Sequence, residues 1–269
     1  MHWGPNEARS QIVVPGPDDD KYSRGVLGVI TGSAMYPGAA VLGVEAALRT
    51  GVGMVRFLGA ERPSELVLAR RPEVVTMDGR VQAWLMGSGM DASSRDAATA
   101  DLLDSAIATG RPTVLDAGAL DLLPRLTGPV VITPHAGELA RVLGVQRAEI
   151  VADPAGAAER AAAHLGVTVL LKGHRTHVAG PGGPLLVAAT APSWLATAGA
   201  GDALAGVLGA LVATHAESIS RRGPELAELA ATAVVIHGLA AEQASAGGPF
   251  VVLDLAASVS VVIARLLAG

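Results

Sequence analysis

Short, mainly apolar runs alternate with stretches of helical periodicity along most of the chain. Each run is bounded by glycine, proline or polar residues, and few of them alternate between apolar and polar positions. Continuous apolar runs of this length predict strands that are buried on both faces of a sheet. We expect strands at 27–31, 52–58, 73–77, 83–86, 113–116, 130–133 and 167–172.

Helical patterns separate these runs. The first helix is expected to begin near Pro37, which suits a first turn, and to end at Gly51. Another should contain Leu102, Leu103 and Ile107, and further helices are expected at 63–70, 154–165, 201–214, 224–244 and 255–267. Strands that alternate with helices predict a mostly parallel sheet between two helical layers, which is a three-layer α/β/α sandwich.

One pair of short runs breaks the alternation. Residues 174–178 and 185–188 are separated by a Gly/Pro-rich turn at 180–184, which predicts an antiparallel hairpin. Residues 1–23 are mostly polar and are expected to form a loosely held N-terminal arm. No flexible linker or change in composition divides residues 24–269, so we expect a single domain there.

The carboxyl ends of the expected parallel strands carry small, polar and acidic residues. Ligands of such sheets bind at this edge. The residues that follow the strands are Gly32-Ser33, Gly87-Ser88-Gly89, Asp116, Thr133-Pro134-His135 and Lys172-Gly173. The sequence therefore places a functional site at one edge of the sheet.

Composition narrows the range of partners. The chain of 269 residues has no cysteine, which excludes disulfides and thiolate metal sites. Mean hydropathy is +0.43, but no apolar stretch is long enough to span a bilayer, and the first residues contain no apolar segment typical of a signal peptide. A net charge of -5 without a basic patch argues against nucleic acid. We expect a cytoplasmic protein with neither a membrane nor nucleic acid as partner.

The most informative motif is Thr-Ala-Gly-Ala-Gly-Asp at 197–202, directly before an apolar helix. Glycines allow a tight turn, and the free amides of a helix start bind anions. Asp202 in the first turn is then placed to accept a proton from a hydroxyl that attacks a phosphoryl group. Taken alone, the motif favours a glycine-rich turn in which Asp202 caps the helix, because short glycine motifs often occur by chance.

Three other segments change this balance. They are Gly-Ser-Ala-Met-Tyr-Pro-Gly-Ala-Ala at 32–40, Thr-Pro-His-Ala-Gly-Glu at 133–138 and Leu-Lys-Gly at 171–173. With the loop at 199–202, and in this order, they resemble the ADP-dependent NAD(P)H-hydrate dehydratases of the ribokinase-like superfamily. The resemblance implies a ribokinase-like sandwich with its hairpin near the nucleotide site. It also implies ADP-dependent dehydration of NADHX or NADPHX to NAD(P)H, with release of AMP and phosphate, in a magnesium-dependent homotetramer.

The resemblance also implies roles for particular residues. Asp202 matches the catalytic position, and Ala40, Gly89 and His135 match positions that bind the hydrated dinucleotide together with Asp202. Glu138 matches an acid near Mg²⁺ and would act on the ion through water. Nucleotide-binding positions correspond to Lys172, Gly173, His174, Arg175, Thr176, Gly199, Ala200 and Gly201.

Some positions depart from the family pattern, and alternatives stay open. Ser88 stands where the family has proline, Gly118 where it has a second acid, and Ala198 where it has glycine.

A kinase of the same fold that phosphorylates a vitamin precursor, such as a thiazole alcohol, is the main alternative, although His135 stands where such kinases have asparagine. A non-catalytic nucleotide-binding protein is another. His135 and Glu138 could also serve only to start a helix. The sequence leaves open NADHX against NADPHX, and ADP against ATP.

Overall fold

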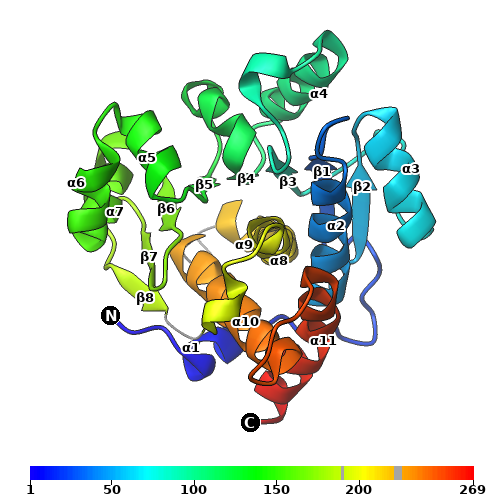
Figure 1. Cartoon of the computed structure of the whole chain (residues 1–269). Helices are drawn as coiled ribbons and strands as arrows, with labels where there is room; N and C mark the ends of the chain where they lie inside the picture. The colour runs from blue at the N-terminus through cyan, green and yellow to red at the C-terminus, as the bar shows by residue number, and fades with distance from the viewer. Residues whose placement is uncertain (189–190, 221–225) are drawn as a thin grey trace.

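A computed structural model describes residues 1–188, 191–220 and 226–269, and its centre is a single sheet of eight strands (Figure 1). The strand order is β2-β1-β3-β4-β5-β6-β7-β8. All pairs from β2 to β6 are parallel, whereas β7 is antiparallel to both β6 and β8. The strands are β1 (Val26–Ile30), β2 (Met54–Phe57), β3 (Ala83–Met86), β4 (Thr113–Leu115), β5 (Val130–Ile132), β6 (Thr168–Leu171), β7 (Thr176–Ala179) and β8 (Leu186–Ala188). The expected mostly parallel sheet and its antiparallel hairpin are confirmed.

One expected strand is absent. Residues 73–77 form no strand, and only a single bridge joins Val75 to Arg56 of β2. Most of the segment is exposed, and Val74 is its buried side chain. The short apolar run there pairs with β2 at this one position, through backbone hydrogen bonds of Val75 with Val55 and Phe57, and forms no strand of its own.

Helices cover both faces of the sheet (Figure 1). Successive strand residues point to opposite layers, so that Leu85 of β3 joins one core cluster, and Trp84 and Met86 join the other. The first layer contains α2 (Gly38–Thr50), α3 (Glu61–Arg70), α8 (Ala200–Thr214), α10 (Leu226–Ser245) and α11 (Val252–Ala268). The second contains α4 (Ala97–Ala108), the 3₁₀ helix η2 (Ala117–Arg125), α5 (Ala136–Leu143), α6 (Arg147–Ala152) and α7 (Pro154–Leu165). Shorter elements are α1 (Pro5–Ser10), α9 (Ala216–Ser220), η1 (Ala92–Ser94) and η3 (Ser193–Leu195).

The expected helices lie close to these bounds. Position 224, where the helix at 224–244 was expected to begin, lies outside the described residues, and α10 is described from Leu226. No helix in the described ranges combines the length and the apolar character needed to cross a bilayer.

Glycines allow α2 and α8 to lie very close together. A Cβ on Gly206 of α8 would lie 2.1 Å from the carbonyl oxygen of Gly43 of α2, which is closer than real atoms approach. On the loop side of this contact, a Cβ on Gly43 would lie 3.4 Å from the backbone oxygen of Asp202. The close approach therefore fixes the start of α8 relative to the sheet.

The first ten residues are not loosely held, contrary to the expectation for residues 1–23. The amino group of Met1 donates to the carbonyl oxygen of Leu185 (2.6 Å), and the backbone N–H of Trp3 donates to the carbonyl oxygen of Val187 (3.0 Å). Trp3 is only 5% exposed, and its indole donates to the hydroxyl of Thr232 (3.1 Å). A buried aromatic side chain and edge pairing beside β8 dock this segment, whereas residues 13–23 are exposed.

Candidate active site at the carboxyl edge of the sheet

The loop before α8 leaves backbone amides open to an anion. Gly199 has φ +90°, in the left-handed region that favours glycine, and this turn directs the chain into the helix. The backbone N–H of Ala203 is bonded to the oxygen of Gly199 (3.1 Å). No backbone hydrogen bond among the described residues uses the amides of Gly201 and Asp202. Free amides at the start of a long helix suit a phosphate group.

Asp202 lies in the first turn of α8 in an environment that disfavours its charge. Burial and then the negative charge of Asp116 raise the pKa of Asp202 to about 6, although Lys172 opposes this shift. The capping interpretation does not hold, because the residue before α8 is Gly199 and no side chain caps that helix start. A carboxyl group with a pKa near neutrality is suited to proton transfer.

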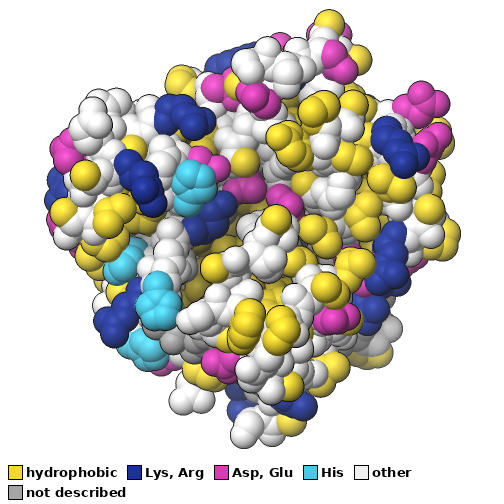
Figure 2. Space-filling view, in the orientation of Figure 1, with side chains coloured by type: hydrophobic (Ala, Val, Ile, Leu, Met, Phe, Trp, Pro, Cys, Tyr) yellow, Lys and Arg dark blue, Asp and Glu magenta, His cyan; other side chains and the backbone are white. Residues whose placement is uncertain are grey.

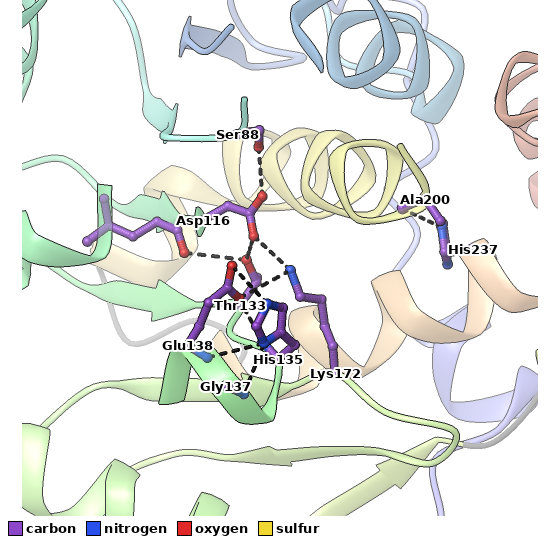
Figure 3. A network of polar contacts seen from close by, with 10 residues as sticks. Ser88, Asp116, Thr133, His135, Gly137, Glu138, Lys172, Ala200 and His237 are labelled. Carbon is purple, nitrogen blue, oxygen red and sulfur yellow. Dashed lines mark hydrogen bonds and ion pairs between the residues drawn. The ribbon is translucent and has the colours of Figure 1, made fainter. Parts of the chain in front are cut away.

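Asp116 is the centre of a buried polar network (Figure 3). It follows β4 and is 2% exposed. Its Oδ2 accepts from the hydroxyl of Ser88 (2.9 Å), and its Oδ1 accepts from the hydroxyl of Thr133 (2.7 Å) and the ammonium of Lys172 (2.9 Å). The donors follow β3, β5 and β6, so the parallel topology itself brings them together.

Lys172 carries the positive charge of this network. Burial opposes the charge, but Asp116, Glu138 and Asp202 together raise the pKa of Lys172 above its ordinary value. Its ammonium lies 3.9 Å from Glu138, and a Cβ on Gly201 would lie 3.5 Å from it. Lys172 therefore places a positive charge between the start of α8 and the start of α5.

His135 and Glu138 begin α5 as a reciprocal cap (Figure 3). The Nδ1 of His135 accepts from the amides of Gly137 (3.0 Å) and Glu138 (3.1 Å), so its Nε2 carries the proton in the neutral ring. The backbone N–H of His135 donates to Glu138 (2.8 Å). Both residues thus start a helix, as the structural alternative expected. The His135 ring remains more than half exposed at the site, whereas the Glu138 side chain is mostly buried.

Two cavities meet at His135. The first has a volume of about 690 Å³ and extends over the start of α8; it is lined by Lys172, Gly173, His174, Thr176, Ala200, Gly201 and His237, among others. The second, of about 670 Å³, lies between η2 and α5 and includes Tyr36, Met90, Gly118, Glu138 and Arg141. Acidic, basic and histidine side chains surround the hollow at the centre of this face (Figure 2). Both volumes are in the range of small-molecule sites.

Ala40 and Gly89, two of the predicted substrate-binding residues, belong to segments that pack closely on each other. A Cβ on Gly89 (φ +67°) would lie 2.4 Å from the Cβ of Ala39, and one on Gly32 would lie 3.0 Å from the Cβ of Ala40. The start of α2 therefore packs directly on the loop after β3. Ala40 itself is fully buried, so it shapes this part of the edge, and neither it nor Gly89 lines the two cavities.

The residues after β6 are placed unequally. His174 and Thr176 line the first cavity, and Thr176 is buried at the start of β7. Arg175 is exposed and does not line that cavity. Gly199 does not line the first cavity either. It packs against α2, since a Cβ at this position would lie 2.5 Å from the side chain of Leu42. Its part is therefore to shape the loop.

His237 is a site residue to which the sequence assigned no role. It lies on α10, is buried, and its Nε2 donates to the carbonyl oxygen of Ala200 (2.9 Å), which can only accept. Burial lowers the pKa of His237 to about 4, and the nearby Lys172 acts in the same direction. A neutral histidine therefore holds the first residue of α8. The two residues are 37 positions apart, and only the packing of α10 against α8 reveals the contact.

The sheet order and the glycine-rich loop before a buried helix define a class of protein. A solved structure of a ribokinase-like superfamily protein from Enterococcus faecalis superposes with a TM-score of 0.86 at 22% identity, covering 100% of this chain and 97% of that one. The chain therefore has the ribokinase-like fold that the sequence predicted.

Within this class, residues 27–260 match the NAD(P)H-hydrate dehydratase family, and the chain belongs to it. It is 46% identical over 213 residues to the bifunctional NAD(P)H-hydrate repair enzyme of Mycobacterium tuberculosis, covering 75% of this chain and 43% of that protein. The chain thus spans less than half the length of this relative.

Relatives of similar length also match. The ADP-dependent (S)-NAD(P)H-hydrate dehydratase of Neisseria meningitidis is 35% identical over 244 residues, covering 84% of this chain and 79% of its own. The ADP/ATP-dependent NAD(P)H-hydrate dehydratase of Bacillus subtilis, co-crystallised with ATP/Mg²⁺, superposes with a TM-score of 0.86 at 26% identity and covers 98% of both chains.

Proposed function

We propose that the protein converts hydrated NADH or NADPH back to NAD(P)H, with ADP as the phosphoryl donor. The observation that carries this proposal is the position of Asp202, a carboxyl group with a raised pKa in the same helix turn as free amides and close to the Lys172 ammonium. The names of the Neisseria and Bacillus relatives support the reaction and the nucleotide.

In this mechanism the ring hydroxyl of the hydrate attacks the terminal phosphorus of ADP, and the bond from that phosphorus to the bridging oxygen breaks to release AMP. Asp202 accepts the hydroxyl proton. The amides of Gly201 and Asp202, with Lys172, stabilise the charge on the transferring group. Phosphate then leaves the ring carbon, helped by the lone pair of the ring nitrogen, and loss of a ring proton restores the dihydronicotinamide. Hydroxide alone would be a poor leaving group.

The two cavities suit the two substrates. ADP would lie in the first, with its terminal phosphate over Gly201 and close to Lys172, and with His174 and Thr176 along its length. The hydrated dinucleotide would approach from the second, past His135, towards Asp202 at the start of α8. Ala40 and Gly89 would shape this edge from the contact between α2 and the loop after β3. Because His135 borders both cavities, the hydroxyl and the phosphorus would meet beside it.

Magnesium fits this site as a companion of the nucleotide. No group of three potential metal ligands occurs among the residues that the structure describes, so the side chains alone do not form a metal centre. Mg²⁺ typically binds through substrate phosphates, water and one or two carboxylates. Glu138 is the acid we propose near the ion, through water. When bound, the ion would neutralise charge on the phosphates.

The direct test is an assay of the purified protein with NADH hydrate, Mg²⁺ and ADP. Recovery of the reduced-nicotinamide absorbance with release of equal amounts of AMP and phosphate would support the proposal. A stable phosphorylated alcohol from a thiazole-type substrate would instead support a vitamin kinase. Nucleotide binding without turnover of either substrate would support a non-catalytic role.

We also propose that the protein is a cytoplasmic homotetramer. A cytoplasmic homotetramer is consistent with a family of metabolic repair enzymes and with exposed apolar side chains such as Met35 and Trp194. Light scattering of the purified chain should give about four times the monomer mass of 27.0 kDa. A mass of 27.0 kDa at working concentration would contradict the tetramer.

A further inference from the structure

Asp116 is a buried carboxylate to which the proposed reaction assigns no step. Among the described residues, its side chain accepts three hydrogen bonds, from residues that follow β3, β5 and β6, and two of the donors, Ser88 and Thr133, are uncharged hydroxyls. These hydroxyls hold both oxygens of the carboxylate in place. The third donor is the ammonium of Lys172, which lies 2.9 Å from this fixed carboxylate. The network thus has one mobile partner, the long side chain of the lysine.

We propose that Asp116 is a positioning residue that holds the Lys172 ammonium over the first turn of α8, where it can contact the terminal phosphate of a bound nucleoside diphosphate. The inference rests on the nucleotide-binding part of the proposed function. Its geometric basis is that the ammonium lies 3.5 Å from where a Cβ of Gly201 would be, beside the free amides of that turn. The backbone N–H of Lys172 is also tied to Pro134 (2.8 Å), so only the side chain can move.

A second acid makes the position of Lys172 depend on Asp116. Glu138 on α5 lies 3.9 Å from the same ammonium and belongs to the wall of the second cavity. Asp202 in the first turn of α8 also attracts this ammonium, but Glu138 is the acid that forms an ion pair with it. Without the charge on Asp116, the lysine would therefore shift towards Glu138 and away from α8. Asp116 therefore determines on which side of the boundary between the two cavities the positive charge is available.

The ratio of ADP to AMP affinity tests this role without any turnover, since only ADP carries the terminal phosphate. We would measure both by calorimetry with Mg²⁺ for wild type, Asp116→Asn, Lys172→Met and the double variant. Each single change should lower the affinity for ADP about tenfold relative to AMP, and the double variant should lose no more than the larger single change, because both act through one ammonium. Asp104→Asn, an exposed acid on α4, has the same charge change and should keep the wild-type ratio.

The outcomes separate the inference from the function on which it rests. A folded Asp116→Asn variant with the wild-type ratio, while Lys172→Met loses it, would overturn the positioning role alone, as would losses that multiply in the double variant. If wild type binds neither nucleotide, the proposed function and the inference both fail.

Should Asp116→Asn not fold, the orienting hydroxyls offer a second route. Ser88→Ala combined with Thr133→Val keeps the charge but releases the carboxylate from its fixed orientation. The ratio should then fall by about threefold, since a less ordered carboxylate holds the ammonium less firmly. A wild-type ratio in this folded double variant would also overturn the inference.

Discussion

Asp202 has surroundings that favour its protonated form, and this has a consequence for rate. The carboxylate is the form that accepts a proton, and its pKa is raised to about 6 by burial and by Asp116. Turnover should therefore fall as the pH is lowered through about 6, following one ionisation. Asp202→Ala should lower kcat by orders of magnitude and leave the KM for the dinucleotide nearly unchanged. A kcat within about tenfold of wild type, roughly 1.4 kcal/mol of barrier, would contradict the assignment.

The same environment has the opposite consequence for stability. An acid whose pKa is higher in the folded than in the unfolded protein destabilises the fold once it is ionised, and the penalty grows as the pH rises from about 4 to about 6. Asp202→Asn should therefore increase the free energy of unfolding at pH 7 by about 1–3 kcal/mol. Urea denaturation at pH 7 and near pH 4 would measure this. A gain of equal size at both values would show that charge is not the cause.

For single residues, the sequence correctly predicts which edge of the sheet carries the polar residues, but it does not predict the hydrogen bonds that join them to Asp116. The sequence marks Asp116 as an acid that follows a strand and indicates no role for it. That Ser88, Thr133 and Lys172 all bond to it depends on β3, β4, β5 and β6 being consecutive neighbours in the sheet. Strand order is a property of the whole fold, so the residues alone could not reveal these contacts.

Among the elements, the pair α2 and α8 depends most on small side chains. Gly206→Ala would place a Cβ 2.1 Å from the backbone oxygen of Gly43, so one helix must shift. We expect a loss of about 1–3 kcal/mol in the free energy of unfolding and weaker ADP binding, because the start of α8 would move. Gly38→Ala is the control: it is an exposed α2 position with nothing within 4 Å of the added Cβ. Equal melting temperatures of the two variants would contradict close packing of α2 on α8.

Elements with strong periodicity were predicted from the sequence close to their observed positions. The buried strands and the long helices are examples, since their apolar patterns report directly on burial. The strand expected at 73–77 was wrong because an apolar pair such as Val74 and Val75 can be partly buried without pairing along its length. The apolar pattern of a segment that forms a single bridge is the same as that of a short strand.

For the whole molecule, the N-terminal segment is part of the folded unit. Trp3 packs on α10 through a hydrogen bond to Thr232, 229 residues away in the chain. Trp3→Ala should lower the free energy of unfolding by about 3–5 kcal/mol, because a large buried side chain is lost. Val14→Ala, at an exposed position, is the matched control and should change it little. Urea denaturation of both variants checks this, and equal midpoints would show that the segment is not docked. A contact over such a distance could not be predicted from local pattern.

The reversal of chain direction at β7 separates two turns that are close in sequence. The turn from β6 to β7 lies at the edge that carries the candidate site, whereas the turn at 180–184 lies at the opposite edge, because β7 runs antiparallel to β6. Pro181, Gly182 and Pro184 are exposed there. A short affinity tag inserted at this point would be a strand length away from the candidate site, so the protein could be immobilised on a surface while the two cavities stay open to solvent.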